Sequence, residues 1–378
     1  MYTVVDYGRM AADPVRMDAF CRAIARSVKP GSVVLDLGAG NGIMSILALR
    51  AGASRVHAVE PNDAVWLIPE IANENGLAGR VVVHQASSLD MDVPEPIDVV
   101  ISDMRGALPL LEDNFPALLD VAERWLAPGG IIMPTRDELK VTLVDAPALA
   151  QRLEDSTRSF ENLGIRASAV RRTIRNQVYS DSIASLSASD VLTTTATWAT
   201  IDYHHVSLAN LEATVVLEAT RGGVGRGLAA FFDTELVPGV RFTTAPGHSV
   251  VYHRLYLPLL EEIVVEPGDR LVVTMRADVR GERIGWDTTH ERAGASLRVQ
   301  RQSTFLGEPS SLEGLMRGSS TATPRVGSKG SRLGKMLLAM DGSRTVREIA
   351  EAATTTERGE SAERLVDLAR NLAIRYGV

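Results

Sequence analysis

A glycine-rich turn between two acidic residues is the feature of this sequence best suited to chemistry. An apolar, β-branched run over 33–37 breaks into glycines at 38, 40 and 42, and Asp36 stands two residues before the first of them. Glycines at such a turn take positive φ and let the backbone approach a ligand closely. A second apolar run ends at Glu60, where a carboxylate can accept both hydroxyls of a ribose. The spacing is GxGxG and not the dinucleotide GxGxxG, so it predicts a nucleotide-type site of another kind.

The elements that must position this turn alternate between strand and helix. Apolar β-branched runs predict strands at 33–37, 56–60, 80–84, 97–102, 130–134 and 139–144, and amphipathic patterns predict helices at 42–51, 63–75 and 115–126. Such alternation indicates an α/β, doubly wound, Rossmann-like parallel sheet with its ligand at the carboxyl ends of the strands. Before it, Asp13-Pro14 predicts a helix N-cap followed by proline at the first helical position.

The strand, the DxGxGxG turn and the strand-end Glu60 together resemble the class I S-adenosylmethionine (SAM) methyltransferases. Over about residues 2–305 the chain further resembles the protein arginine methyltransferases. That family's loop with two acids corresponds to Ser102-Asp103-Met104-Arg105-Gly106 through Glu112, with Asp in place of the family's first Glu and Arg105 in place of a Met. Further matches lie at 160–164, 202–206, 229–235 and 242–246.

The resemblance implies the site residues. It assigns the SAM cofactor, with S-adenosylhomocysteine as product and no metal, to Arg16, Asp36, Gly38, Ala39, Gly40, Glu60, Pro61, Ser88 and Asp103. It assigns catalysis to Asp103 and Glu112, with Tyr252 and His253 in place of the family's Thr-His-Trp loop, and substrate contacts to Met10, Asp13 and Arg105. His253 or Tyr252 could order the helix through Asp13 or relay a proton. The segment 156–180 would hold a dimerisation arm, implying a homodimer.

The acceptor atom stays open between two nitrogens. A pair of carboxylates can hold a cationic nitrogen, aim its lone pair and accept its proton. Asp103 is one methylene shorter than Glu, and a planar guanidinium needs two well-spaced acids. The shortened acid, the adjacent Arg105 and the altered loop at Tyr252 therefore favour an amine slightly over an arginine.

The chain beyond residue 145 changes character twice. Thr- and Val-rich alternating segments at 193–203, 211–220, 226–235, 250–257, 270–277 and 295–302 predict an antiparallel barrel or sandwich, and the resemblance to the protein arginine methyltransferases implies the β-barrel. We place domains at 1–145 (SAM binding), 146–306 (barrel, for substrate and dimerisation), 307–330 (linker) and 331–378. The last resembles the helical half of PqqD-type winged helices, through Asp341-Gly342-Ser343-Arg344-Thr345 and the residues after it. That resemblance implies binding of a leader peptide and places the enzyme in the biosynthesis of ribosomally made, modified peptides.

Composition narrows the class of protein. The formal net charge is −7, so no general nucleic-acid surface is expected. No apolar run reaches membrane-spanning length, and Cys21 is the single cysteine, which fits a reducing cytoplasm. No His or Cys cluster indicates a metal.

Three functions remain open. The first is a SAM-dependent N-methyltransferase for a ribosomally made peptide. The second is a general protein arginine N-methyltransferase with a partner-binding tail. The third is a catalytically degenerate methyltransferase fold that serves as a scaffold, which the intact glycine turn and Glu60 argue against.

Overall fold

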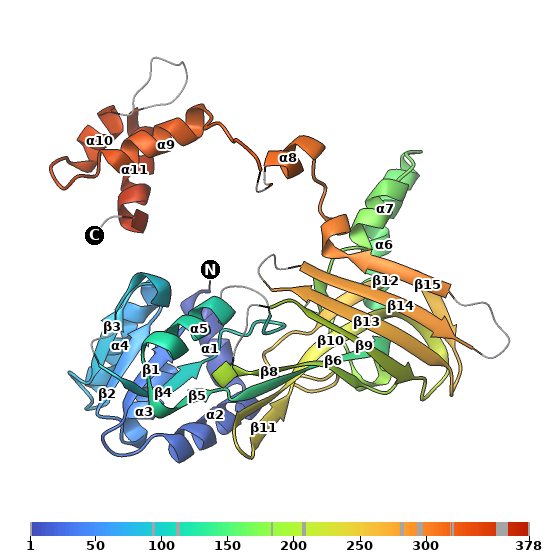
Figure 1. The fold of residues 1–378 in the computed structure, drawn as a ribbon, viewed down its shortest axis with the longest axis horizontal. Coiled ribbons are helices and arrows are strands. Elements are labelled where there is room, and N and C mark those ends of the chain that lie inside the picture. The colour runs from blue at the N-terminus through green and yellow to red at the C-terminus, as the bar shows by residue number, and fades with distance from the viewer. Residues whose placement is uncertain are drawn as a thin grey trace. The chain divides into compact units, whose positions relative to one another are not determined.

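The chain forms two compact units, residues 1–309 and 310–378 (Figure 1). This computed structural model describes residues 2–92, 95–110, 114–182, 184–205, 209–279, 283–292, 298–317, 319, 321–352 and 362–376. None of its helices, within those ranges, combines the length and the apolar character needed to cross a bilayer. The contact boundary places the segments predicted as SAM-binding and barrel domains in one unit.

The first unit begins with a five-stranded parallel sheet in the order β3-β2-β1-β4-β5. Its strands are β1 Val33–Leu37, β2 Arg55–Val59, β3 Val81–His84, β4 Ile97–Ser102 and β5 Leu126–Met133. The helices of this part are α1 Val4–Ala12, α2 Pro14–Ser27, α3 Ile43–Ala51, α4 Leu67–Glu74 and α5 Asn114–Arg124, with 3₁₀ turns at Asp63–Trp66 and Ser88–Asp90. The Rossmann-like prediction is confirmed.

Side-chain caps fix where the first two helices begin. The Asp13 carboxylate accepts the backbone N–H groups of Val15 and Arg16, both at 3.0 Å, and Pro14 takes the first helical position, as predicted. Helix α1, which the sequence pattern had not indicated, begins with a capping box between Thr3 and Asp6. Two helices therefore precede the sheet, where one was predicted.

The second part of the unit holds two antiparallel sheets. One has the order β7-β12-β10-β6-β8 with β11 on β10, and the other has the order β15-β14-β13-β9. The strands are β6 Arg136–Val144, β7 Tyr179–Ser180, β8 Ala196–Asp202, β9 Leu211–Glu218, β10 Gly223–Val237, β11 Val240–Thr243, β12 Leu255–Val265, β13 Arg270–Asp278, β14 Arg283–Glu291 and β15 Arg298–Ser303. Hydrogen-bonded pairing among the described strands does not close them into one barrel, so the closed barrel is not confirmed.

One strand begins later than its sequence pattern indicated. We predicted a strand over 250–257, but β12 starts at Leu255. The Val251 N–H is donated to Asp13 at 2.6 Å and the Arg254 N–H to Asp181 at 2.9 Å. Because these donors serve carboxylates, they are lost to strand pairing, and the segment 250–254 is irregular.

A helical arm extends from this part of the unit. It consists of α6 Pro147–Asn162 and α7 Ser168–Ile174, with Leu163 exposed over 76% of its surface and Phe160 and Ile165 also exposed. Further 3₁₀ turns lie at Ala188–Asp190, Tyr203–His205 and Thr304–Gly307.

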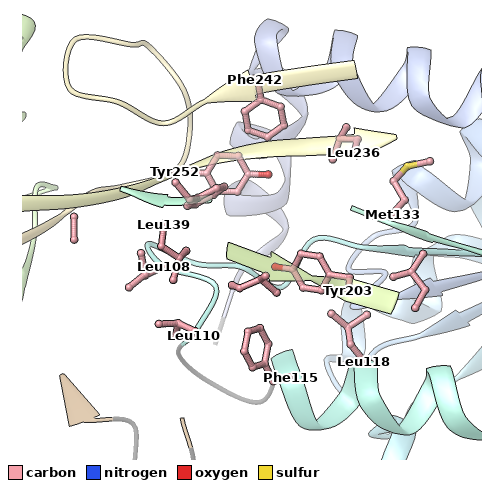
Figure 2. Packing of buried hydrophobic residues seen from close by; sticks show 14 of the residues in the cluster. Leu108, Leu110, Phe115, Leu118, Met133, Leu139, Tyr203, Leu236, Phe242 and Tyr252 are labelled. Atoms are coloured by element: carbon pink, nitrogen blue, oxygen red, sulfur yellow. The ribbon is translucent and has the colours of Figure 1, made fainter. Parts of the chain in front are cut away.

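One apolar core joins the parallel sheet to the antiparallel part (Figure 2). Phe115 and Leu118 of α5 pack with Tyr203, whose ring meets that of Phe115 edge to face with the centroids 6.3 Å apart. Leu108 follows β4, and Leu236 belongs to β10. Each such buried side chain contributes about 1.5–3 kcal/mol. The two parts therefore form a single folded body whose shared face can hold a site.

The second unit is helical over its described residues. It contains α8 Leu312–Arg317, α9 Ser328–Leu338, α10 Val346–Ala352 and α11 Ala362–Tyr376. Met336, Ile349, Leu365 and Ala369 form its core. The Thr345 hydroxyl accepts the Glu348 N–H, and the Glu348 carboxylate accepts the Thr345 N–H, which together form a capping box. A winged-helix fold is not shown, and α8 lies inside the predicted linker.

Candidate active site

A cavity of about 640 Å³ opens at the carboxyl ends of β1, β2 and β4. Its other walls come from α1, α2 and the segment 251–253 of the antiparallel part. Ligand pockets usually measure about 300–1,000 Å³ and lie at this edge of an open parallel sheet. The cavity brings together most predicted site residues, namely Met10, Arg16, Asp36, Gly38, Ala39, Gly40, Glu60, Pro61, Ser88, Asp103, Tyr252 and His253.

The glycine turn is built around the carboxylate of Glu60. That carboxylate accepts the N–H of Gly40 and the N–H of Asn62, both at 2.9 Å. Gly40 has φ +54°, and a Cβ there would lie 2.5 Å from the Tyr7 ring, so only glycine fits beneath α1. The turn therefore holds Glu60 at the cavity wall and is covered by the ring of Tyr7.

Asp36 lies beneath the turn as a buried acid. Its carboxylate accepts the Ser45 hydroxyl at 2.6 Å. Burial raises the pKa of Asp36 from 3.8 to about 6, although the bonds from Ser45 oppose the shift. The Asp36 carboxylate is therefore placed to orient the glycine turn and the part of the cavity wall beneath it.

The Ser88 hydroxyl provides a test of whether SAM fits here. It lines the cavity, is buried and has no hydrogen-bond partner among the described residues. Buried polar groups normally have partners, so an orphaned hydroxyl on a cavity wall suits a bound polar ligand. A ribose acceptor at Glu60, a cation at Arg16 and this hydroxyl together match the polar groups of SAM.

The opposite end of the cavity holds a charged cluster centred on Asp103. Arg16 Nε donates to Asp103 Oδ2 at 2.6 Å, and the Tyr252 hydroxyl donates to the same carboxylate at 2.7 Å. Burial alone would raise the pKa of Asp103, but Arg16 and Arg105 hold it below its usual value. Burial and Asp103 raise the pKa of Tyr252, so its hydroxyl stays protonated as a donor. Asp103 is therefore a firmly ionised carboxylate.

Comparison with known proteins agrees with this geometry. A family model described as Methyltransferase domain matches residues 34–130. Protein arginine N-methyltransferase 6 of Xenopus laevis is 29% identical over 268 residues, which cover 68% of this chain and 78% of that protein. Probable protein arginine N-methyltransferase 6 of Arabidopsis thaliana is 30% identical over 233 residues, which cover 60% of this chain and 53% of that protein. The chain is a SAM-dependent methyltransferase. It resembles the protein arginine N-methyltransferases.

Solved structures share the fold of this methyltransferase. Arabidopsis thaliana protein arginine methyltransferase 10 superposes with a TM-score of 0.68 at 20% identity, covering 80% of this chain and 98% of that one. The Trypanosoma brucei PRMT1 enzyme–prozyme heterotetrameric complex with AdoHcy gives a TM-score of 0.69 at 22% identity, covering 79% and 97%.

The predicted substrate residues of the methyltransferase take different positions. Met10 lines the cavity, and its carbonyl accepts Arg16 Nη1 at 3.1 Å. Asp13, the N-cap of α2, is buried and accepts the backbone N–H of Val251. The predicted contact between Asp13 and the segment 251–253 is therefore made by the backbone, and not by the side chain of Tyr252 or His253. Arg105 is 1% exposed and does not line the cavity. Glu112 lies outside the described residues.

His253 and Tyr252 diverge although they are adjacent. Both residues line the cavity, but the Tyr252 side chain is buried beside Phe242, whereas the His253 side chain is 54% exposed. His253 Nδ1 lies 3.3 Å from Asp181 Oδ1. His253 therefore stands at the cavity mouth with a carboxylate behind it.

Two acids of the methyltransferase escaped the sequence analysis. Asp137 lies on β6 in register with the inward-facing Leu139 and Val141, and an acid at an inward strand position is a signal of a buried polar network. Asp181 follows the two-residue strand β7 and carried no such signal.

Proposed function

We propose that this enzyme transfers the methyl group of SAM to a nitrogen of a protein or peptide side chain or terminus. One observation carries the proposal: a single cavity runs from Glu60, suited to a ribose, to the Arg16–Asp103–Tyr252 cluster, where an acceptor can meet the methyl group. Its relatives are named as protein arginine N-methyltransferases, which supports a protein substrate.

The side chains divide the work between cofactor and acceptor. SAM supplies an electrophilic methyl group on a sulfonium, so the protein needs mainly to position the reactants and complement their charge. Glu60 and Ser88 would hold the nucleoside, and Arg16 would pair with the carboxylate of the methionine part. Asp103 fixes Arg16, and Met104 and Gly106 line the cavity beside it.

Arginine is the acceptor that the relatives favour. Each relative named above is called a protein arginine N-methyltransferase, which supports general arginine methylation with residues 310–378 as a partner-binding tail. In this proposal Glu112 supplies the second acid. The scaffold hypothesis would require SAM binding without methyl transfer to any peptide.

An amine acceptor is the second candidate, favoured by a specific observation. Asp103 is already paired with two guanidinium groups, those of Arg16 and Arg105, so it has little capacity for a third. The substrate would then be a ribosomally made peptide whose leader segment binds residues 331–378. The separate core of that unit, around Met336 and Leu365, is compatible with such a recruitment module.

A dimer is part of the proposal. The arm formed by α6 and α7 exposes Phe160, Leu163 and Ile165 at its tip, and clustered apolar side chains on a surface mark interaction sites. The Trypanosoma brucei relative is described as a heterotetrameric complex.

The test is methyl transfer from labelled SAM to peptides, with fragmentation mass spectrometry to place the methyl group. Asp103→Asn should abolish transfer, because the carboxylate that fixes Arg16 and Tyr252 is lost at nearly constant shape. Asp18→Asn is the matched control, since Asp18 lies on the same helix as Arg16 and forms only an exposed pair with Arg22. Glu112→Gln tests the second acid. Undiminished transfer by Asp103→Asn would refute the site.

A further inference from the structure

The guanidinium of Arg105 is enclosed completely by protein. Nη1 donates to Thr234 Oγ1 at 2.6 Å and lies 3.4 Å from Asp137 Oδ1, while Nη2 donates to the Tyr252 hydroxyl at 3.0 Å. The rings of Phe20, Phe232, Phe242 and Tyr252 surround it, with centroids 5.2–6.0 Å from Cζ. A buried guanidinium with this many donors satisfied is held rigidly and stays charged.

Arg105 binds the carboxylate oxygen of Asp103 that Arg16 leaves open. Nε and Nη2 of Arg105 donate to Asp103 Oδ1 at 3.2 and 2.9 Å, and Arg16 occupies Oδ2. The Tyr252 hydroxyl contacts both carboxylate oxygens. The Asp103 side chain is only 10% exposed. An incoming guanidinium would have to displace one of these bonds to pair with Asp103.

Among the described side chains of the cluster, the charges leave no net attraction for a cation. Arg16 and Arg105 carry two positive charges, and Asp103 and Asp137 supply at most two negative ones. Burial raises the pKa of Asp137, although Arg105 opposes the shift, so any protonation there makes the cluster positive. Placing another cation beside a neutral or positive buried cluster is unfavourable.

We propose that Arg105 is the specificity-determining residue of the acceptor end, which admits the uncharged α-amine of a peptide and disfavours the guanidinium of an arginine side chain. This inference rests on the proposed function and selects between its two candidates. The α-amine has a pKa of about 7.7–8.0, so a large share of it is neutral near pH 8, whereas a guanidinium with a pKa above about 12 is always charged.

The chemical step is balanced without a base at Asp103. The neutral amine uses its lone pair to form the N–CH₃ bond as the S–CH₃ bond breaks, and the bonding electrons stay on sulfur. The positive charge passes from sulfur to the methylated nitrogen, and the resulting ammonium releases its proton to water. No proton has to reach Asp103, whose pKa is lowered by Arg16 and Arg105.

The test compares two peptides of the same sequence with the intact chain. One is N-acetylated and contains a single arginine, and the other has a free α-amine and glutamine in place of that arginine; neither contains lysine. The wild-type chain should prefer the free amine in kcat/KM. Arg105→Met should shift the ratio towards the arginine peptide by about tenfold or more, because one uncompensated carboxylate then faces the acceptor.

Two further variants separate charge from folding. Arg105→Lys keeps the positive charge and should keep the wild-type preference, which a purely structural role would not predict. Arg105→Met with Asp137→Asn removes the buried acid that Arg105 leaves behind, so that a soluble protein is available if the single variant does not fold. This double variant keeps the net charge of the cluster but frees Asp103 Oδ1 from both Arg105 donors, so its ratio should shift in the same direction by a smaller factor.

The outcomes are distinct. A wild-type chain that prefers the acetylated arginine peptide, or an unchanged ratio in the Arg105→Met proteins, overturns the role of Arg105 while the proposed methyl transfer stands. Transfer to neither peptide by wild-type and variant proteins alike refutes the proposed function, and this inference with it.

Discussion

Replacing Gly40 by alanine tests the geometry of the cofactor end most directly. Gly40 has φ +54°, and an added Cβ would lie 2.5 and 2.8 Å from two carbons of the Tyr7 ring. Gly79 is the matched control, because it has φ +73° but open space around the same position. Both variants bear the left-handed backbone cost of about 1–2 kcal/mol. Only Gly40→Ala must also displace the Tyr7 ring, and this overpacking should lower the free energy of unfolding by about a further 1–3 kcal/mol.

The displaced ring should also weaken cofactor binding. Tyr7 lines the cavity, and losing an aromatic wall costs roughly 1–2 kcal/mol, a factor of about 5–30 in affinity. Isothermal titration calorimetry with SAM should show this loss for Gly40→Ala and none for Gly79→Ala. In thermal unfolding, Tyr7→Ala added to Gly40→Ala should cost less than the sum of the two changes, since the clash is gone. Equal SAM affinities and equal stabilities for the two alanine variants would refute the packing of Tyr7 over the turn.

Three further predictions concern other parts of the chain. The pKa of Asp36 is raised from 3.8 to about 6 in the folded protein, so between these pH values the folded protein holds a proton that the unfolded chain has released. The contribution of Asp36 to the free energy of unfolding therefore falls as pH rises from about 4 to 6. Asp36→Asn has no such titrating group, so its free energy of unfolding in urea, relative to wild type, should rise by up to about 3 kcal/mol over that pH range. A difference between the two proteins that does not change with pH would contradict the raised pKa of Asp36. Ending the chain after Pro309 should leave a folded, SAM-binding protein that loses affinity for a long peptide, whereas an insoluble product would show that the last unit supports the first. Leu163→Asp should convert a dimer to monomers in light scattering, and a wild-type chain that is monomeric throughout would reject the arm as an interface.

The sequence predicted the parallel sheet and its turn closely because their signals are local. The predicted strands at 33–37 and 97–102 coincide with β1 and β4, and the N-cap at Asp13 lies where it was predicted. A glycine that must take positive φ, an apolar run and a cap each depend on neighbours within a few residues. The same holds for the capping box of Thr345 and Glu348 in the second unit.

The antiparallel part was predicted less well because strand pairing is not local. Alternation indicated most of its strands, but β14 (Arg283–Glu291) was missed and β12 starts later than its pattern. The start of β12 depends on Asp13 and Asp181, which take backbone donors from the preceding loop. Whether the strands form a closed barrel or two sheets depends on pairings that alternation does not encode.

The sequence alone determined that Asp103, Arg105 and Tyr252 belong near one site, through the glycine turn and the resemblance that accompanies it. Only the tertiary structure decided that Arg105 turns away from the cavity and neutralises Asp103. A buried guanidinium must have its donors satisfied, and its partners Asp137, Thr234 and Tyr252 lie 32, 129 and 147 residues further along the chain. No local pattern can specify partners at those separations, so the charge of the acceptor end was fixed by folding.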